Sequence, residues 1–117
     1  MPDPEVRRGD IWWVDFSPVR GSEQGGIRPA LVLQNDTGNR ASTTTIVAAI
    51  TSQYRRPYPF QVEISAEESG LEKPSLVLLE QLRTVDKSRL RGWIGRLSLD
   101  RMLDVERAIK RSLGMIT

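Results

Sequence analysis

Two residue types, cysteine and histidine, are missing from this chain of 117 residues. Without cysteine the chain has no disulfide, no thiolate metal ligand and no cysteine nucleophile. Without histidine it lacks the usual general acid and base near neutral pH, the usual zinc ligand and any Ser-His triad. Any catalysis must therefore use carboxylates, hydroxyls, arginine or backbone groups.

Long apolar segments are also missing. No run approaches the roughly 18 residues that a membrane-spanning helix needs. The N-terminus, MPDPEVRRGD, lacks the apolar core of a signal peptide. We therefore expect a cytoplasmic protein with no membrane partner, and the length suits one domain over residues 1–117.

Lysine is scarce, with three lysines against fourteen arginines and a formal net charge of only +2. Arginine binds phosphate through two N–H groups and stacks on bases, so this bias favours a nucleic-acid partner. A GC-rich genome, which favours arginine codons, is the alternative explanation.

Six segments have the composition or the alternation of β-strands. They are residues 10–16, 29–35, 43–52, 60–65, 75–87 and 93–97. The fifth is long for one strand, so we expect it to bend. Residues 36–42 have turn chemistry. Strands that follow one another through short turns favour an antiparallel, strongly curved sheet or a small barrel.

The C-terminal part changes to a helical period. Ser98 is a plausible N-cap for one amphipathic helix, and residues 87–91 could form a single helical turn before it. The apolar stripe, which we interpret as core, consists of Leu99, Met102, Leu103, Ile109 and Leu113. The sequence therefore predicts a mainly β fold with a C-terminal helix.

The segment GSEQGGIRP, residues 21–29, is the first candidate site. Its adjacent glycines let backbone amides approach a ligand, and Arg28 can project a guanidinium towards it. A mobile hairpin loop with a solvated Arg28 is the alternative. A second candidate is AAITSQ, residues 48–53, where Thr51, Ser52 and Gln53 form a polar cluster or simply a polar turn.

A third candidate is LLEQLRTVD, residues 78–86. Glu80, Gln81 and Arg83 interrupt an apolar run there, so at least one of them must face solvent, a partner or a site. Pairing of Glu80 with an arginine is the structural alternative, and the local sequence does not choose between them.

These pieces together resemble the MazF/PemK family, the toxins of bacterial toxin–antitoxin modules. The motifs GSEQGGIRP, QND, AAIT and LLEQLRT occur in family order and spacing along nearly the whole chain. The resemblance implies a small SH3-like antiparallel β-barrel of the CcdB/MazF type, assembled as a homodimer. It also implies a sequence-specific, ribosome-independent endoribonuclease that cuts single-stranded RNA, chiefly messenger, without a metal or other cofactor.

The resemblance further implies Arg28 and Thr51 as the catalytic pair. Arg28 would bind the scissile phosphate and Thr51 would donate to a non-bridging oxygen. The 2′-hydroxyl of the RNA would attack and leave 2′,3′-cyclic phosphate and 5′-hydroxyl ends. The loop acid Glu23 is a further catalytic candidate, and either Glu23 or Arg28 would remove the 2′-proton.

Substrate contacts are predicted from placement beside these motifs. They are Ser22, Gln24, Gly25, Gly26, Pro29, Ser52, Gln53, Glu80 and Gln81. The basic and aromatic residues 54–58 could stack bases or bind phosphate, or form an ordinary solvated loop. The family also implies an antitoxin with a disordered acidic segment, and a preference for cleavage sites that contain U-A-C.

Two alternative functions fit the same architecture. A gyrase-poisoning toxin of this fold would bind a protein instead of cutting RNA, although the G-x-R-P and A-I-T motifs argue against it. A non-catalytic barrel would bind a peptide or nucleic acid without forming product.

Overall fold

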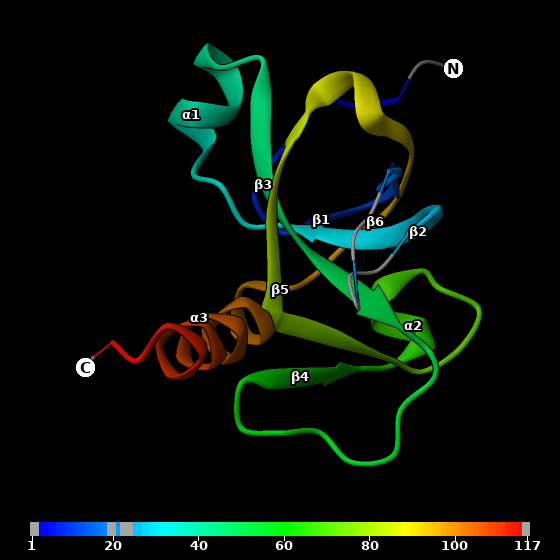
Figure 1. Ribbon diagram of the computed structural model, residues 1–117, viewed down its shortest axis with the longest axis vertical. Coiled ribbons are helices and arrows are strands. Elements are labelled where there is room, and N and C mark those ends of the chain that lie inside the picture. The colour runs from blue at the N-terminus through cyan, green and yellow to red at the C-terminus, as the bar shows by residue number, and fades with distance from the viewer. Residues whose placement is uncertain (1–2, 19–20, 22–24, 116–117) are drawn as a thin grey trace.

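Six strands form one antiparallel sheet in the computed structural model, which describes residues 3–18, 21 and 25–115 (Figure 1). The strands are β1 (Asp10–Asp15), β2 (Ile27–Val32), β3 (Thr44–Thr51), β4 (Gln61–Ile64), β5 (Ser75–Asp86) and β6 (Leu90–Arg96). The helical elements are α1 (Asp36–Ala41), α2 (Ala66–Ser69), the 3₁₀ turn η1 (Lys87–Arg89) and α3 (Leu99–Leu113). The predicted strands and the helical turn after β5 are thus confirmed.

The strand order across the sheet is β4-β5-β3-β2-β1-β6. Apolar residues are buried on both faces of the sheet, in two separate clusters. In β3, for example, Val47 and Ala49 belong to one cluster, and Ala48 and Ile50 to the other. Side chains on both faces of the central strands are therefore buried, and this is why the sequence of these strands contains continuous apolar runs.

Strand β5 bends near its middle, as predicted (Figure 1). Ala48 of β3 pairs with Leu82, but the next residue, Ala49, pairs with Leu78. Residues 79–81 are therefore an excursion of β5 that has no counterpart on β3. Such an insertion bends a strand and redirects its side chains. Here it places Glu80 and Gln81 at the bend.

Helix α3 begins after Ser98, whose side chain accepts a hydrogen bond from the Arg101 N–H. Its buried residues are Met102, Val105 and Ala108. The predicted apolar stripe is therefore partly wrong, because three of its leucines are exposed, Leu99 (87%), Leu103 (51%) and Leu113 (57%). The buried side is set by packing on β4 and β5. No helix in the described part of the chain is long and apolar enough to cross a membrane.

Residues 36–42 form a short helix, so the prediction of a turn was wrong. The Asn35 side chain accepts a hydrogen bond from the Gly38 N–H and caps the helix. Asn39 is buried, and its amide oxygen accepts a hydrogen bond from the Thr45 hydroxyl at 2.7 Å. The polar residues that suggested a turn therefore cap the helix and anchor it to β3.

Helix α2 follows β4, at one edge of the sheet, and packs against β6, at the opposite edge. A Cβ added to Gly70 would lie 2.8 Å from the Ile94 carbonyl oxygen, and one added to Gly95 would overlap the Ser69 carbonyl oxygen. The two backbones therefore approach more closely than any side chain would allow. This contact curls the sheet and brings the segment after β4 against β6.

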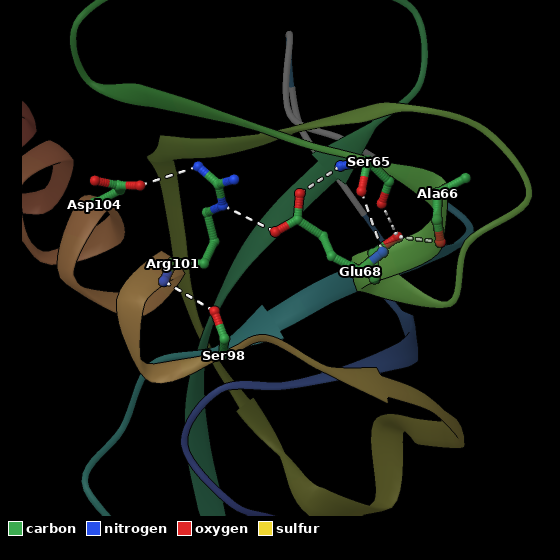
Figure 2. Close-up of polar contacts among 7 residues, drawn as sticks. Ser65, Ala66, Glu68, Ser98, Arg101 and Asp104 are labelled. Carbon is green, nitrogen blue, oxygen red and sulfur yellow. Dashed lines mark hydrogen bonds and ion pairs between the residues drawn. The ribbon is translucent and has the colours of Figure 1, made fainter.

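An ion network connects α2 with α3 (Figure 2). Arg101 donates to Glu68 at 2.9 Å and to Asp104 at 3.0 Å. The second carboxylate oxygen of Glu68 accepts the Ser65 N–H at 2.8 Å, which completes a capping box. Burial alone would raise the pKa of Glu68, but the Ser65 N–H and the Arg101 guanidinium outweigh it and hold this pKa below its usual value.

Candidate functional site

Arg28 and Thr51 lie at the matching ends of two neighbouring strands. Arg28 is the second residue of β2, and Thr51 is the last residue of β3. The two strands pair antiparallel, with Ala30 opposite Ala49. Arg28 and Thr51 each lie two residues beyond this pair, at the end of the two strands where their pairing stops.

Both side chains line one pocket of about 630 Å³, which we call the Arg28 pocket. Its walls come from β1, β2, the end of β3, β6 and the connection from α2 to β5. The residues of the predicted site that line it are Arg28, Pro29, Thr51, Ser52 and Gln53. The structure therefore brings together two motifs that are more than twenty residues apart in the sequence.

Arg28 is exposed, and a backbone carbonyl group fixes its guanidinium. Its Nε donates a hydrogen bond to the Gly25 carbonyl oxygen at 2.7 Å. Gly26 has a φ of 72°, a left-handed conformation that favours glycine and lets the chain turn between these two residues. None of the hydrogen bonds found among the described residues uses the two terminal nitrogens of Arg28, so these nitrogens are available for a phosphate.

The Thr51 hydroxyl is oriented by the turn that follows β3. Its oxygen accepts a hydrogen bond from the Gln53 N–H at 3.1 Å. Its proton has only a long contact, 3.4 Å, with the Gln53 carbonyl oxygen. The hydroxyl can therefore exchange this weak contact for a stronger hydrogen bond to an anionic ligand.

A second pocket, of about 770 Å³, lies on the other side of Thr51 and Gln53, which line both pockets. We call it the Glu80 pocket. Its predicted site residues are Thr51, Gln53, Glu80 and Gln81, and it also contains residues 54–59. Glu80 accepts a hydrogen bond from the Gln61 amide at 2.7 Å. Among the described residues no ion pair joins Glu80 to an arginine, so the structural alternative is not found there.

The loop of residues 54–60 contains aromatic residues that make structural contacts and arginines that are exposed. The Tyr54 hydroxyl donates to the Glu63 carboxylate at 3.1 Å, and its ring packs on the core. Burial, together with that carboxylate, raises the pKa of Tyr54. Tyr58 and Phe60 stack with ring centroids 5.3 Å apart. Arg55 and Arg56 are exposed at the edge of the Glu80 pocket.

Some predicted residues lie elsewhere. Ser22, Glu23 and Gln24 are outside the described residues. Gly25 and Gly26 line neither pocket but shape the turn before Arg28. Arg83 is a structural residue, because it donates to the Phe16 carbonyl oxygen at 2.7 Å and lies over the Phe16 ring.

The sequence analysis missed one wall of the Arg28 pocket. This wall contains Trp13, Trp93, Ile94 and residues 70–73. Trp13 and Trp93 are 43% and 41% exposed, unusually high values for tryptophans in strands. The tandem tryptophans in residues 12–13 were the available signal, because alternation must turn one of them away from any one core face.

Charged groups of both signs line the Arg28 pocket, namely Arg28, Lys73 and Glu72. Nowhere in the described ranges do three or more acidic side chains gather as they would around a metal ion. The arrangement can therefore clamp a phosphate between a guanidinium and a hydroxyl, with a further cation nearby.

Comparison with known proteins gives a consistent result. Residues 7–113 match the family model described as PemK-like, MazF-like toxin of type II toxin-antitoxin system. The chain is 53% identical, over 112 residues, to the endoribonuclease EndoA of Bacillus subtilis (strain 168), with 95% of this chain and 97% of EndoA covered.

Solved structures agree in fold. MazF of Deinococcus radiodurans superposes with a TM-score of 0.82 at 31% identity, covering 97% of this chain and all of the other. The MazE–MazF complex of the same organism gives a TM-score of 0.76 at 31% identity, with the same coverage. The predicted resemblance is confirmed: this chain belongs to the family of PemK-like, MazF-like toxins of type II toxin–antitoxin systems.

Proposed function

We propose that this chain is a toxin that acts as a sequence-specific, ribosome-independent endoribonuclease on single-stranded RNA, chiefly messenger RNA. The observation that carries the proposal is the presence of Arg28 and Thr51 on one pocket. The activity in the name of EndoA, which is similar over nearly its whole length, supports it. Messenger RNA is a cytoplasmic substrate, so the proposed place of action is the cytoplasm.

The proposed reaction uses the RNA as its own nucleophile. The 2′-oxygen bonds to the adjacent phosphorus while the bond from phosphorus to the 5′-oxygen of the next nucleotide breaks. The 2′-hydroxyl loses a proton and the 5′-oxygen gains one, which leaves 2′,3′-cyclic phosphate and 5′-hydroxyl ends. The enzyme must therefore align the attack and stabilise negative charge on the phosphorane-like transition state.

Arg28 and Thr51 suit these two tasks. The Gly25 carbonyl fixes the guanidinium through Nε, so its terminal nitrogens can bind two phosphate oxygens without reorganising. The Thr51 hydroxyl donates to a non-bridging oxygen. Either Arg28 or Glu23 accepts the 2′-proton in this scheme. A guanidinium holds its proton strongly, which makes Arg28 a weak base and leaves Glu23 as the second candidate. No step in this scheme uses a metal ion.

The proposed RNA path runs through both pockets, with the scissile phosphate at Thr51. Ser52 and Gln53 offer hydrogen-bonding groups on one side, and Glu80 and Gln81 on the other. Single-stranded RNA is usually read by hydrogen bonds to the edges of splayed bases. Ser22, Gln24, Gly25, Gly26 and Pro29 complete the proposed contacts, and sites that contain U-A-C are the proposed targets.

Three proposals concern assembly. Residues 1–117 act as one toxin domain whose curled sheet closes as an SH3-like barrel, and two copies form a homodimer. A cognate antitoxin covers the groove with a disordered acidic segment, which the exposed cations Arg28, Lys73, Arg55 and Arg56 would attract. The solved complex of the similar MazF with MazE supports an antitoxin partner.

One assay tests the proposed activity. Purified protein is incubated with a long RNA in excess EDTA, and new 5′ ends are mapped. We expect discrete cuts with 5′-hydroxyl ends. Intact RNA, in conditions where circular dichroism shows folded protein, would overturn the proposal and favour one of the two non-nuclease alternatives. Cleavage only after addition of a divalent metal would overturn its metal independence.

A further inference from the structure

Trp93 is an aromatic residue in the Arg28 pocket that no motif of the family explains. It lies in β6, far in the sequence from Arg28 and Thr51, but lines the same pocket. Trp93 is 41% exposed, whereas tryptophan is highly buried on average. The position therefore exposes a large aromatic ring beside the proposed phosphate clamp.

A bulge in β6 accounts for this placement. Ile11 of β1 pairs with Gly95, and the next residue, Trp12, pairs with Trp93, so Ile94 is an extra residue. In a regular strand, Trp93 and Ile94 would point to opposite faces. In this structure both line the Arg28 pocket. The extra residue thus redirects the Trp93 side chain, as bulges beside binding sites commonly do.

Trp13 forms a second aromatic wall of the pocket. It pairs with Pro29 across β1 and β2, which places it beside the strand that carries Arg28. On its other side it pairs with Gly92, and a Cβ added there would lie 3.7 Å from Trp13 Cδ1. The Trp13 ring therefore lies against Gly92 of β6, where no side chain takes up the space beside it.

Cations complete this end of the pocket. Lys73, in the connection from α2 to β5, is exposed and lines the pocket with Arg28. Exposed aromatic rings that share a pocket with cations are the combination by which proteins hold single-stranded nucleic acid, with bases stacked on rings and phosphates bound by the cations. A flat ring and a positive charge suit a nucleotide better than they suit an apolar peptide.

We propose that Trp93, with Trp13 beside it, is a stacking platform for one base that flanks the cleaved bond, and that Lys73 binds the phosphate of that nucleotide. This inference rests on the proposed nuclease function and adds a subsite to it. Trp93 is a substrate-binding residue in this scheme and touches no reacting atom. Stacking holds substrate and transition state equally, so it acts on KM and leaves kcat unchanged.

The test compares Trp93→Leu with Trp93→Phe on short RNA substrates that contain one cleavage site. Leucine keeps apolar bulk without a flat ring, whereas phenylalanine keeps the ring. We expect Trp93→Leu to raise KM by roughly 5- to 100-fold, as loss of one stacked base does. Trp93→Phe should restore most of this loss, and kcat should stay within about twofold in both variants.

An abasic scan identifies the stacked base. Substrates carry an abasic nucleotide at each position flanking the cut in turn. At one position, wild type and Trp93→Leu should have equal KM values, because the partner base is already absent.

Lys73→Ala tests the proposed phosphate contact. This variant should raise KM relative to wild type by a larger factor at low salt than at high salt.

The outcomes separate the inference from the function on which it rests. If wild type cuts RNA but Trp93→Leu leaves KM unchanged on every substrate, the inference is overturned and the nuclease function stands. A lower kcat with unchanged KM would also overturn it. If Trp93→Leu changes only binding of an acidic peptide, the surface belongs to a protein partner and the inference fails. No cutting by folded wild type overturns both.

Discussion

The Arg28 pocket and the contact between α2 and α3 are both rich in polar groups, but they use these groups differently. Around α2, Glu68 and Arg101 bond to each other and to Ser65 and Asp104. In the Arg28 pocket, the hydrogen bonds among the described residues use only Nε of Arg28, and those of the Thr51 hydroxyl stay within its own turn. The comparison suggests that polar groups of the fold satisfy one another, whereas those of the site are kept for a ligand.

The largest expected effect follows from removing the proposed clamp. Arg28→Ala should lower kcat/KM for RNA cleavage by about 10²–10³-fold, because one preorganised donor to the transition state is lost. Thermal unfolding should hardly change, since Arg28 is exposed and makes one hydrogen bond to a nearby carbonyl. A folded variant with full cleavage activity would show that Arg28 is an ordinary surface charge, and the proposed difference between the two regions would be wrong.

The next largest effect is on stability alone. Gly95→Ala should destabilise the protein by about 2 kcal/mol or more, because the added methyl group would overlap the Ser69 carbonyl oxygen. We expect the melting temperature to fall by roughly 5 to 15 °C. Gly92→Ala is the matched control in the same strand, because its Cβ would meet Trp13 at an ordinary 3.7 Å. Equal melting temperatures for the two variants would show that the α2–β6 approach is not tight.

A smaller effect concerns the ion network. Glu68→Gln should lower the free energy of unfolding at neutral pH by about 1 kcal/mol, less than the roughly 1.5–3 kcal/mol of a hydrogen bond to a charged group, because the Arg101–Glu68 pair is partly exposed. The folded-state pKa of Glu68 is lowered, so its contribution is present above the unfolded value of 4.5 and is lost as pH falls through the folded pKa. Urea unfolding should show a smaller difference from wild type near pH 3 than near pH 7. A difference that is the same at both pH values would rule out this electrostatic account.

The smallest effect lies at the exposed end of the same network. Arg107 pairs with Asp104 at 2.9 Å, but its side chain is 65% exposed. Arg107→Ala should therefore change the free energy of unfolding by no more than about 0.5 kcal/mol, and cleavage activity should stay the same. If urea unfolding shows that Arg107→Ala loses as much free energy of unfolding as Glu68→Gln, burial does not determine which ion pairs stabilise the protein.

Local sequence was enough to predict most of the sheet. Residues 46–50, for example, are a continuous apolar run, and Val47 to Ile50 are buried alternately in the two clusters, so this composition is visible without a structure. The bend in β5 was also predicted, because residues 75–87 are long for one strand, and the structure places it at the excursion of residues 79–81. Helix α2 was missed although Ser65 and Glu68 carry the capping-box spacing.

The site was only partly predictable, because tertiary pairing builds half of it. Local reading favoured a mobile loop for residues 21–29, and only the family motifs connected Arg28 with Thr51. Trp93 enters the pocket through a bulge whose position depends on how β6 pairs with β1. Leu99 and Leu103 fit the helical period but are exposed, because packing on the sheet selects a different side of α3.

A double-mutant cycle on Arg28 and Thr51 tests most directly whether these two residues act as one clamp. Cleavage rates are measured for Arg28→Ala, Thr51→Ala and the double variant on the same RNA in EDTA. We predict that Thr51→Ala slows wild type by about 10²–10³-fold, but slows Arg28→Ala by only a few fold, because groups that act as a unit are strongly non-additive. Losses that multiply in the double variant would show two independent contributions and would contradict the shared clamp.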